Sequence, residues 1–304
     1  MHLLSCSNLE PILAYRCLVI VDKNFLFPGG PNGVNSKSYT LTTKTDKRCT
    51  FVSFKQRMEE TSKKQQSSIV LALDFPYHKP SEFKNLQAKA QSMLSMVSPY
   101  VCAVKINHHL TLPLGTFGAV QTLVKQAHEN GLLAIMDGKV NDIGATNQTI
   151  AEYYYEAGFD ALIANPFIGW EEGLKPIFDV AQRMRRGVIL LAYMSHKGAA
   201  EGYGQTLYDL QTGEKTPQYL NFAKKALSRN ADGVVVGATV PDKIREIYSV
   251  LGETVPIYSP GVGAQGGAAQ EALRAGARYL IVGREIVQSE NPVEQAKKLS
   301  QESS

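Results

Sequence analysis

Residues 132–147 read LLAIMDGKVNDIGATN and join an apolar run directly to a group of charges. The first five of them, residues 132–136, predict a buried strand. Asp137, Lys139 and Asp142 then follow within six positions. Buried charges are costly unless they are paired, so the end of this strand is a candidate functional position.

Short apolar runs rich in Val, Ile and Leu recur along the chain from Ser68 onward. They occupy residues 68–74, 101–106, 132–137, 160–165, 187–194, 233–238, 255–260 and 278–283. Longer amphipathic segments separate them, which indicates parallel βαβ units whose sheet is covered on both faces. Eight such units in roughly 235 residues are typical of a (β/α)8 TIM barrel, an α/β fold. A doubly wound open sheet is the alternative, but the first run is not followed by the GxGxxG pattern of that fold.

The composition argues against several kinds of partner. The chain has 304 residues, 44% of them hydrophobic, and a net charge of +4. Without a block of like charge it offers neither a nucleic-acid groove nor a polybasic membrane anchor. Residues 12–27 are apolar in patches, but Arg16, Asp22 and Lys23 interrupt them, which argues against a membrane span or a signal peptide. We therefore expect no nucleic-acid partner and no membrane partner.

The four cysteines show no CxxC or Cys/His ligand spacing. This pattern predicts neither a metal site nor a disulfide framework. A reducing, cytoplasmic setting fits such a chain best.

The N-terminal part differs from the rest in composition. Residues 29–68 are rich in Ser, Thr, Lys, Asn and Gln, which is typical of a segment that cannot build a core. We therefore expect residues 1–65 to form a poorly structured extension outside the fold, with one helix near 53–65. The barrel would comprise residues 66–304.

Charged residues stand at the ends of three consecutive predicted strands. Asp74 ends the first, Lys105 lies near the end of the second, and Asp137 ends the third. Lys139 shares the inward face with Asp137 if the extended conformation continues. Asp142 alone could simply cap the helix predicted over 145–158. Because catalytic residues of this barrel lie at the C-terminal ends of strands, charges of alternating sign on adjacent strands indicate an active site.

The last two strands indicate a phosphate site. The segment SPGVGAQGG (259–267) follows the seventh strand and leads into a helix, and VGREI (282–286) follows the eighth. Glycines allow close approach of the backbone, and the N–H groups at a helix start favour an anion. Arg284 adds a planar cation suited to phosphate oxygens. The glycines could also serve only tight turns, but this is the usual phosphate position in the barrel.

The connection over 195–217 is long for a βα loop and contains several glycines. Two interpretations stay open. It is a mobile lid that covers the substrate, or it is a disordered insertion.

From Ser68 to the C-terminus the chain resembles the orotidine 5′-phosphate decarboxylases. DGKVNDIGAT (137–146) is similar to that family's Asp-x-Lys-x-x-Asp-Ile motif with a downstream threonine. The shorter motifs LALD, VKI, MSHKGA, PGVGAQGG and VGR occur in the family's order at matching strand ends. The resemblance implies decarboxylation of orotidine 5′-phosphate to UMP in pyrimidine biosynthesis. It also implies that no metal or organic cofactor takes part, and that the enzyme is a homodimer with shared active sites.

The resemblance also implies roles for single residues. Lys139 would donate the proton, with Lys105, Asp137 and Asp142 completing the charged array. The partner's site would receive Asp142, Ile143 and Thr146. The substrate-binding residues within the chain would be Asp74 and Lys105 at the ribose, Asp137 near the substrate carboxylate, Ser195 at the pyrimidine, and Pro260, Gly261, Val262, Gly263, Ala264, Gln265, Gly266, Gly267, Gly283 and Arg284 around the phosphate.

Two details depart from the family's commonest pattern. Asn107 stands where a glycine often follows the KI pair, and Phe75 and Pro76 follow Asp74 where polar residues are frequent. Both leave the charged side chains in place, and both change the residues next to the expected ribose contacts.

Three other functions compete with this one. Sugar-phosphate enzymes of the same superfamily, such as keto-gulonate phosphate decarboxylase or hexulose phosphate synthase, share Asp-x-Lys-x-x-Asp. They use Mg²⁺ and carry a carboxylate on the second strand, where this chain has Lys105. A non-catalytic phosphate-binding barrel would not need Lys139 between two aspartates. A fused orotate phosphoribosyltransferase domain would need more than the 65 residues before the barrel.

Overall fold

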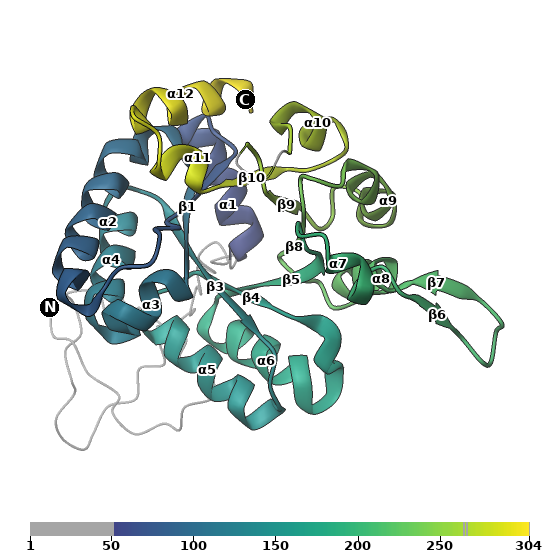
Figure 1. Cartoon of the computed structure of the whole chain (residues 1–304). Helices are drawn as coiled ribbons and strands as arrows, with labels where there is room; N and C mark the ends of the chain where they lie inside the picture. The colour runs from purple at the N-terminus through teal and green to yellow at the C-terminus, as the bar shows by residue number, and fades with distance from the viewer. Residues whose placement is uncertain (1–51, 264, 266, 304) are drawn as a thin grey trace, which may run out of the picture. The chain divides into compact units, whose positions relative to one another are not determined.

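The computed structural model describes residues 52–263, 265 and 267–303 (Figure 1). The expectations for residues 1–51, Ala264 and Gly266 lie outside this part of the chain. Within the described ranges, no helix is long and apolar enough to cross a membrane.

Eight parallel strands form a closed barrel in the order β1-β10-β9-β8-β5-β4-β3-β2, with β2 pairing again with β1. Their bounds are β1 Ile69–Ala72, β2 Ala103–Asn107, β3 Leu133–Val140, β4 Ala161–Ala164, β5 Gly187–Tyr193, β8 Gly233–Val236, β9 Ile257–Pro260 and β10 Tyr279–Val282. All eight predicted strands are therefore present, and the predicted TIM barrel is confirmed.

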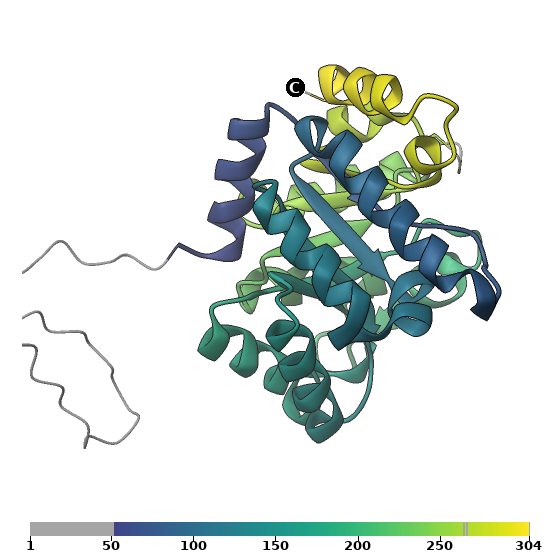
Figure 2. The same ribbon diagram turned by 90° about the vertical axis from the view of Figure 1, so that its left-hand side faces the viewer.

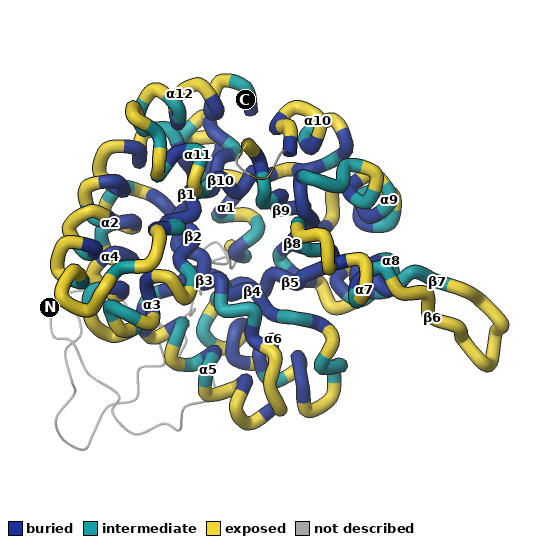
Figure 3. The backbone as a smooth tube through the Cα atoms, in the orientation of Figure 1, coloured by how far each residue is buried: buried dark blue, intermediate teal, exposed yellow. Residues whose placement is uncertain are grey.

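Helices surround the barrel and cover its outer face (Figures 1 and 2). The main ones are α2 Phe83–Val97, α3 His108–Leu114, α4 Gln121–Glu129, α5 Gly144–Glu156, α6 Lys175–Met184, α8 Gln218–Ser228, α9 Pro241–Leu251, α10 Ala269–Arg274, α11 Arg284–Val287 and α12 Pro292–Glu302. Strands β1, β4, β8 and β10 are consequently buried along their whole length (Figure 3). Burial on both faces explains why the strands read as continuous apolar runs.

Helix α1, Phe54–Gln65, corrects the expected boundary of the fold. The predicted helix is present, but it packs on the barrel instead of lying outside it. Phe54 and Met58 are fully buried, and a Cβ atom added at Gly187 would lie 2.5 Å from the Phe54 ring. Arg57 forms a 2.6 Å ion pair with buried Asp160, which immediately precedes β4. The fold therefore includes residues 54–65, ahead of the expected start at residue 66. The helix carries few apolar residues, so its sequence alone does not show that it is buried.

The long connection after β5 carries regular secondary structure, unlike the disordered insertion that was one of its two interpretations. It contains the short helix α7, Ala199–Gly202, followed by the antiparallel strands β6, Thr206–Tyr208, and β7, Lys215–Pro217. The hairpin projects from the barrel (Figure 1). Among residues 195–217, Ser195 is the one that lines the cavity at the mouth of the barrel.

Candidate active site

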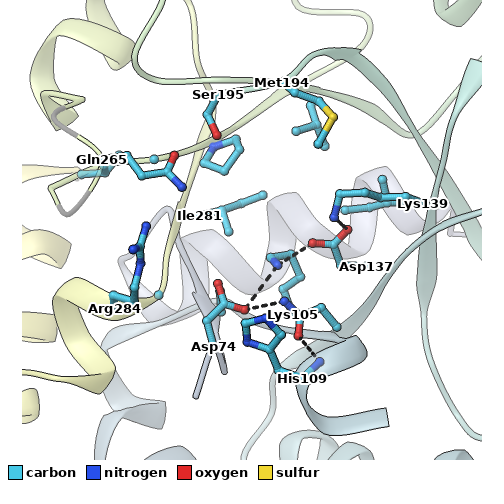
Figure 4. A pocket seen from close by; sticks show the side chains of 18 of the residues that line it. Asp74, Lys105, His109, Asp137, Lys139, Met194, Ser195, Gln265, Ile281 and Arg284 are labelled. Atoms are coloured by element: carbon cyan, nitrogen blue, oxygen red, sulfur yellow. Dashed lines mark hydrogen bonds and ion pairs between the residues drawn. The ribbon is translucent and has the colours of Figure 1, made fainter. Parts of the chain in front are cut away.

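A cavity of about 480 Å³ opens at the C-terminal ends of the strands (Figure 4). The predicted site residues that line it are Asp74, Lys105, Asp137, Lys139, Ser195, Pro260, Gly261, Val262, Gln265, Gly283 and Arg284. Barrel closure thus brings residues from six different strand ends into one space.

Asp137 bridges two lysines at the bottom of this cavity. Its Oδ2 atom lies 2.6 Å from Nζ of Lys105, and its Oδ1 atom lies 2.6 Å from Nζ of Lys139. Both Asp137 and Lys105 are buried, with 7% and 4% of their surface exposed. A buried carboxylate with a cation on each oxygen is fully paired, which is the condition for keeping such charges inside a protein.

The pairing fixes the charge states of the buried members. Burial alone would raise the pKa of Asp137, but the ammonium groups of Lys105 and Lys139 lower it to about 2. Burial alone would likewise lower the pKa of Lys105, but the negative charges of Asp137 and Asp74 outweigh it and raise that pKa. Asp137 is therefore a carboxylate, and Lys105 an ammonium, at neutral pH.

The backbone at Lys139 departs from the expected extended conformation. Met136 pairs with Leu162 and Val140 with Ala164, so residues 137–139 face the single residue Ile163. Lys139 itself has a φ of +45°, in the left-handed region that non-glycine residues rarely adopt. This bulge turns the Lys139 side chain toward Asp137, as bulges near active sites often re-aim a side chain. The predicted shared orientation is present, but a strained bulge produces it.

The carboxylate of Asp74 is held at the adjoining strand ends. Its Oδ1 atom accepts a 2.7 Å hydrogen bond from Nδ2 of Asn107 and lies 4.0 Å from Nζ of Lys105. A Cβ atom at Gly283 would lie 2.9 Å from Oδ2 of Asp74. A side chain at position 283 would therefore displace this carboxylate.

The glycine-rich loop after β9 supplies the opposite side of the cavity. Figure 4 shows Gln265 and Arg284 together on that side, away from Lys139. Gly261 has a φ of +98°, and a Cβ atom there would lie 2.6 Å from Oε1 of Gln265. Gly263 and Gly267 do not line the cavity. They close the loop instead, through a hydrogen bond from N of Gly263 to O of Gly267.

Asp142, Ile143 and Thr146 also lie outside this cavity. All three are exposed, Ile143 to 70%. Lys139 therefore pairs with one aspartate of its own chain, Asp137, and the expected second carboxylate is not at its side. Asp142 is not the side-chain cap of α5 either, because its Oδ1 accepts from N of Ile143, the residue before the helix.

The cavity also has an apolar wall that the sequence did not predict, which consists of Ile163, Leu191, Met194, Val235 and Ile281. These side chains point inward from β4, β5, β8 and β10 or follow a strand directly. No periodicity marks them, because both faces of the strands are buried. Asn107 and His109 also line the cavity. In the sequence, Asn107 stands out only as a departure from the family's pattern.

Comparison with known proteins agrees with this geometry. The sequence model described as orotidine 5′-phosphate decarboxylase / HUMPS family matches residues 67–299. The chain belongs to this family. An orotidine 5′-phosphate decarboxylase of Methanosarcina acetivorans is 36% identical over 203 residues, which cover 67% of this chain and 83% of that protein. The one of Pyrococcus furiosus is 34% identical over 234 residues, covering 77% and 96%.

Solved structures of the decarboxylase family share the fold. The orotidine 5′-monophosphate decarboxylase of Methanocaldococcus jannaschii, complexed with the inhibitor BMP, superposes with a TM-score of 0.64 at 32% identity. The match covers 78% of this chain and 98% of that one. Within the described residues, no group of three or more His, Cys, Asp or Glu side chains could hold a metal ion.

Proposed function

We propose that the protein is an orotidine 5′-phosphate decarboxylase, which converts orotidine 5′-phosphate to UMP and CO₂ in pyrimidine biosynthesis. The observation that carries the proposal is the bridging of Lys105 and Lys139 by Asp137 in a cavity whose other side holds Arg284. The relatives named above, which are decarboxylases, support the same activity.

Lys139 is the proposed proton donor. When the bond between C6 and the carboxylate breaks, CO₂ leaves and the electron pair stays on C6 in an orbital that the ring cannot delocalise. An ammonium group held beside C6 stabilises this charge and then transfers a proton to it. Lys139 becomes a neutral amine and regains a proton from solvent. Asp137 supports the step because its Oδ1 atom fixes the ammonium at 2.6 Å.

The remaining cavity residues are proposed to bind the rest of the nucleotide. Asp74 and Lys105 would contact the ribose, and Ser195 the pyrimidine. Arg284, Gln265 and the loop over 260–267 would hold the phosphate, with Arg284 contributing charge-assisted hydrogen bonds. The apolar wall would lie against the flat ring. Because the phosphate is remote from C6, its binding energy can support the closed geometry that the chemical step needs.

A homodimer with shared sites is also proposed. Asp142, Ile143 and Thr146 are exposed and lie outside their own cavity, so they are free to complete a partner's site. Exposed apolar side chains nearby support an interface: Tyr153 is 54% exposed and Phe117 is 52% exposed, and their rings meet edge to face at 5.8 Å. Ile150 and Tyr154 of the same helix, α5, pack against the core instead.

A cytoplasmic setting completes the proposal. Cys102 is a buried free thiol, and burial raises its pKa to about 12, so this thiol is unreactive at neutral pH.

One assay tests the activity directly. Purified protein should remove the ultraviolet absorbance of orotidine 5′-phosphate and form UMP, before and after exhaustive EDTA treatment. Activity that disappears with EDTA and returns with Mg²⁺ would favour the sugar-phosphate branch of the family. Lys105 on β2, the strand where that branch carries a carboxylate, argues for the pyrimidine nucleotide.

A further inference from the structure

Asn107 is the last residue of β2 and the N-cap of helix α3. Its side-chain amide has hydrogen-bond partners on both sides. Oδ1 accepts a 2.9 Å hydrogen bond from the backbone N of His109, and Nδ2 donates a 2.7 Å hydrogen bond to Oδ1 of Asp74. Turning the amide over would place its oxygen against a carboxylate and its NH₂ against a backbone N–H. The two partners together therefore determine one orientation of this side chain.

Asp74 depends on this contact for its position. Lys105 lies 4.0 Å from Oδ1 of Asp74, which is beyond hydrogen-bond distance, and its ammonium already contacts Asp137 at 2.6 Å. The hydrogen bond to Oδ1 comes from Asn107, across 33 positions of sequence. With Oδ1 occupied, Oδ2 remains on the side of Gly283, where the absent side chain leaves space.

We propose that Asn107 is a positioning residue for Asp74, which orients this carboxylate so that Oδ2 accepts a hydrogen bond from a ribose hydroxyl of the substrate. The inference rests on the proposed function, because it takes the ribose contact of Asp74 from there. A neutral amide suits this task, because it donates a hydrogen bond to the carboxylate of Asp74 without adding a second positive charge beside Lys105. The same side chain thus caps the N-terminus of α3 and positions the carboxylate that recognises the ribose.

A double-mutant cycle tests the inference. Asn107→Ser removes the amide donor but keeps a good N-cap residue for α3, so its thermal unfolding should match that of the unmodified protein. We expect kcat/KM for orotidine 5′-phosphate to fall at least about tenfold, the lower end of the range for a hydrogen bond to a charged group. In the Asp74→Ala background, Asn107→Ser should produce no further loss, because contacting residues that act through each other are not additive.

The substrate provides a second readout that a purely structural role would not change. One ribose hydroxyl, 2′ or 3′, is the proposed partner of Asp74. In Asn107→Ser, the preference for orotidine 5′-phosphate over the deoxy analogue that lacks this hydroxyl should decrease. Should Asn107→Ser fail to fold, Asn107→Gly also removes the donor, adds no charge beside Asp74 and leaves a tolerated N-cap residue, and it replaces Ser in the same cycle.

The outcomes separate the inference from the proposed function. If Asp74→Ala lowers kcat/KM and Asn107→Ser adds its full loss on top, with unchanged selectivity against deoxy analogues, Asn107 does not act through Asp74 and the inference is wrong. If Asp74→Ala leaves kcat/KM unchanged, the proposed ribose contact fails, and the inference fails with it.

Discussion

Lys139 and Asp137 stand only two positions apart, yet their side chains meet at 2.6 Å inside the barrel mouth. On a regular strand, residues i and i+2 would point the same way roughly 7 Å apart. The bulge over residues 137–139 and the positive φ of Lys139 bring the ammonium back to the carboxylate. Strain of this kind persists where the surrounding structure holds it, and it is common at functional sites.

Lys139→Ala should abolish decarboxylation while it largely preserves binding of UMP. Loss of a positioned proton donor typically costs about 10²- to 10⁴-fold in rate, and here the ammonium also stabilises charge. Product formation and UMP affinity are the two measurements. Lys125→Ala is a matched control, since Lys125 is 78% exposed on α4. Near-normal turnover in Lys139→Ala would show that Lys139 is not the proton donor.

Asp137→Asn should destabilise the fold as well as reduce activity. It leaves the buried ammonium of Lys105 without its bridging carboxylate, and breaking a buried pair costs about 3–5 kcal/mol in free energy of unfolding. Urea unfolding measures this loss. Asp179→Asn should cost less than about 1 kcal/mol, because its ion pair with Lys175 is exposed.

The same variant should reveal a pH dependence. The folded pKa of Asp137 is lowered to about 2, so its stabilising contribution is present above the unfolded pKa of about 4. The contribution is lost as pH falls from about 4 toward 2. The difference in unfolding free energy between the unmodified protein and Asp137→Asn should shrink over this interval. A difference that stays constant would contradict the assigned shift.

Arg284→Ala should weaken the binding of phosphorylated ligands. Charge-assisted hydrogen bonds are worth about 1.5–3 kcal/mol, which corresponds to a loss of affinity of about 10- to 150-fold. UMP affinity should therefore fall, whereas the affinity for uridine, which lacks the phosphate, should not. Arg245→Ala serves as the control, because Arg245 lies exposed on α9. Unchanged KM and kcat would mean that the phosphate site lies elsewhere.

Mixed dimers of Lys139→Ala and Asp142→Asn should recover activity that neither variant has alone. If Asp142 serves the partner's site, a mixed dimer contains one intact site and one doubly damaged site. Random pairing makes half of the dimers mixed, so an equal mixture should show about a quarter of full activity. The subunits must be refolded together or co-expressed. Verified mixed dimers no more active than the separate variants would overturn the shared-site proposal.

Phe54→Ala should destabilise the whole barrel, although it lies in the segment that the sequence placed outside the fold. The ring is 1% exposed and packs against Gly187, and removing a buried Phe costs about 3–5 kcal/mol. Tyr77→Ala is the control, because Tyr77 is 86% exposed. Equal midpoints of thermal unfolding for the two variants would show that α1 contributes little.

The sequence by itself determined the barrel and the strand ends that carry charge. A strand covered on both faces must be apolar throughout, so each of the eight was visible as a run. Asp74, Lys105 and Asp137 were then noticeable because they end such runs. The glycines before and around Gln265, together with Arg284, were visible for the same reason.

Only the tertiary structure decided how these residues meet. The contact between Asn107 and Asp74 depends on the pairing of β1 with β2, and the bulge at Lys139 depends on the pairing of β3 with β4. The burial of α1 depends on the space beside Gly187, where the Phe54 ring packs. The sequence of one segment indicates whether that segment is a strand or a helix and whether its residues are buried. Distances between residues of different segments follow from packing, which no single segment encodes.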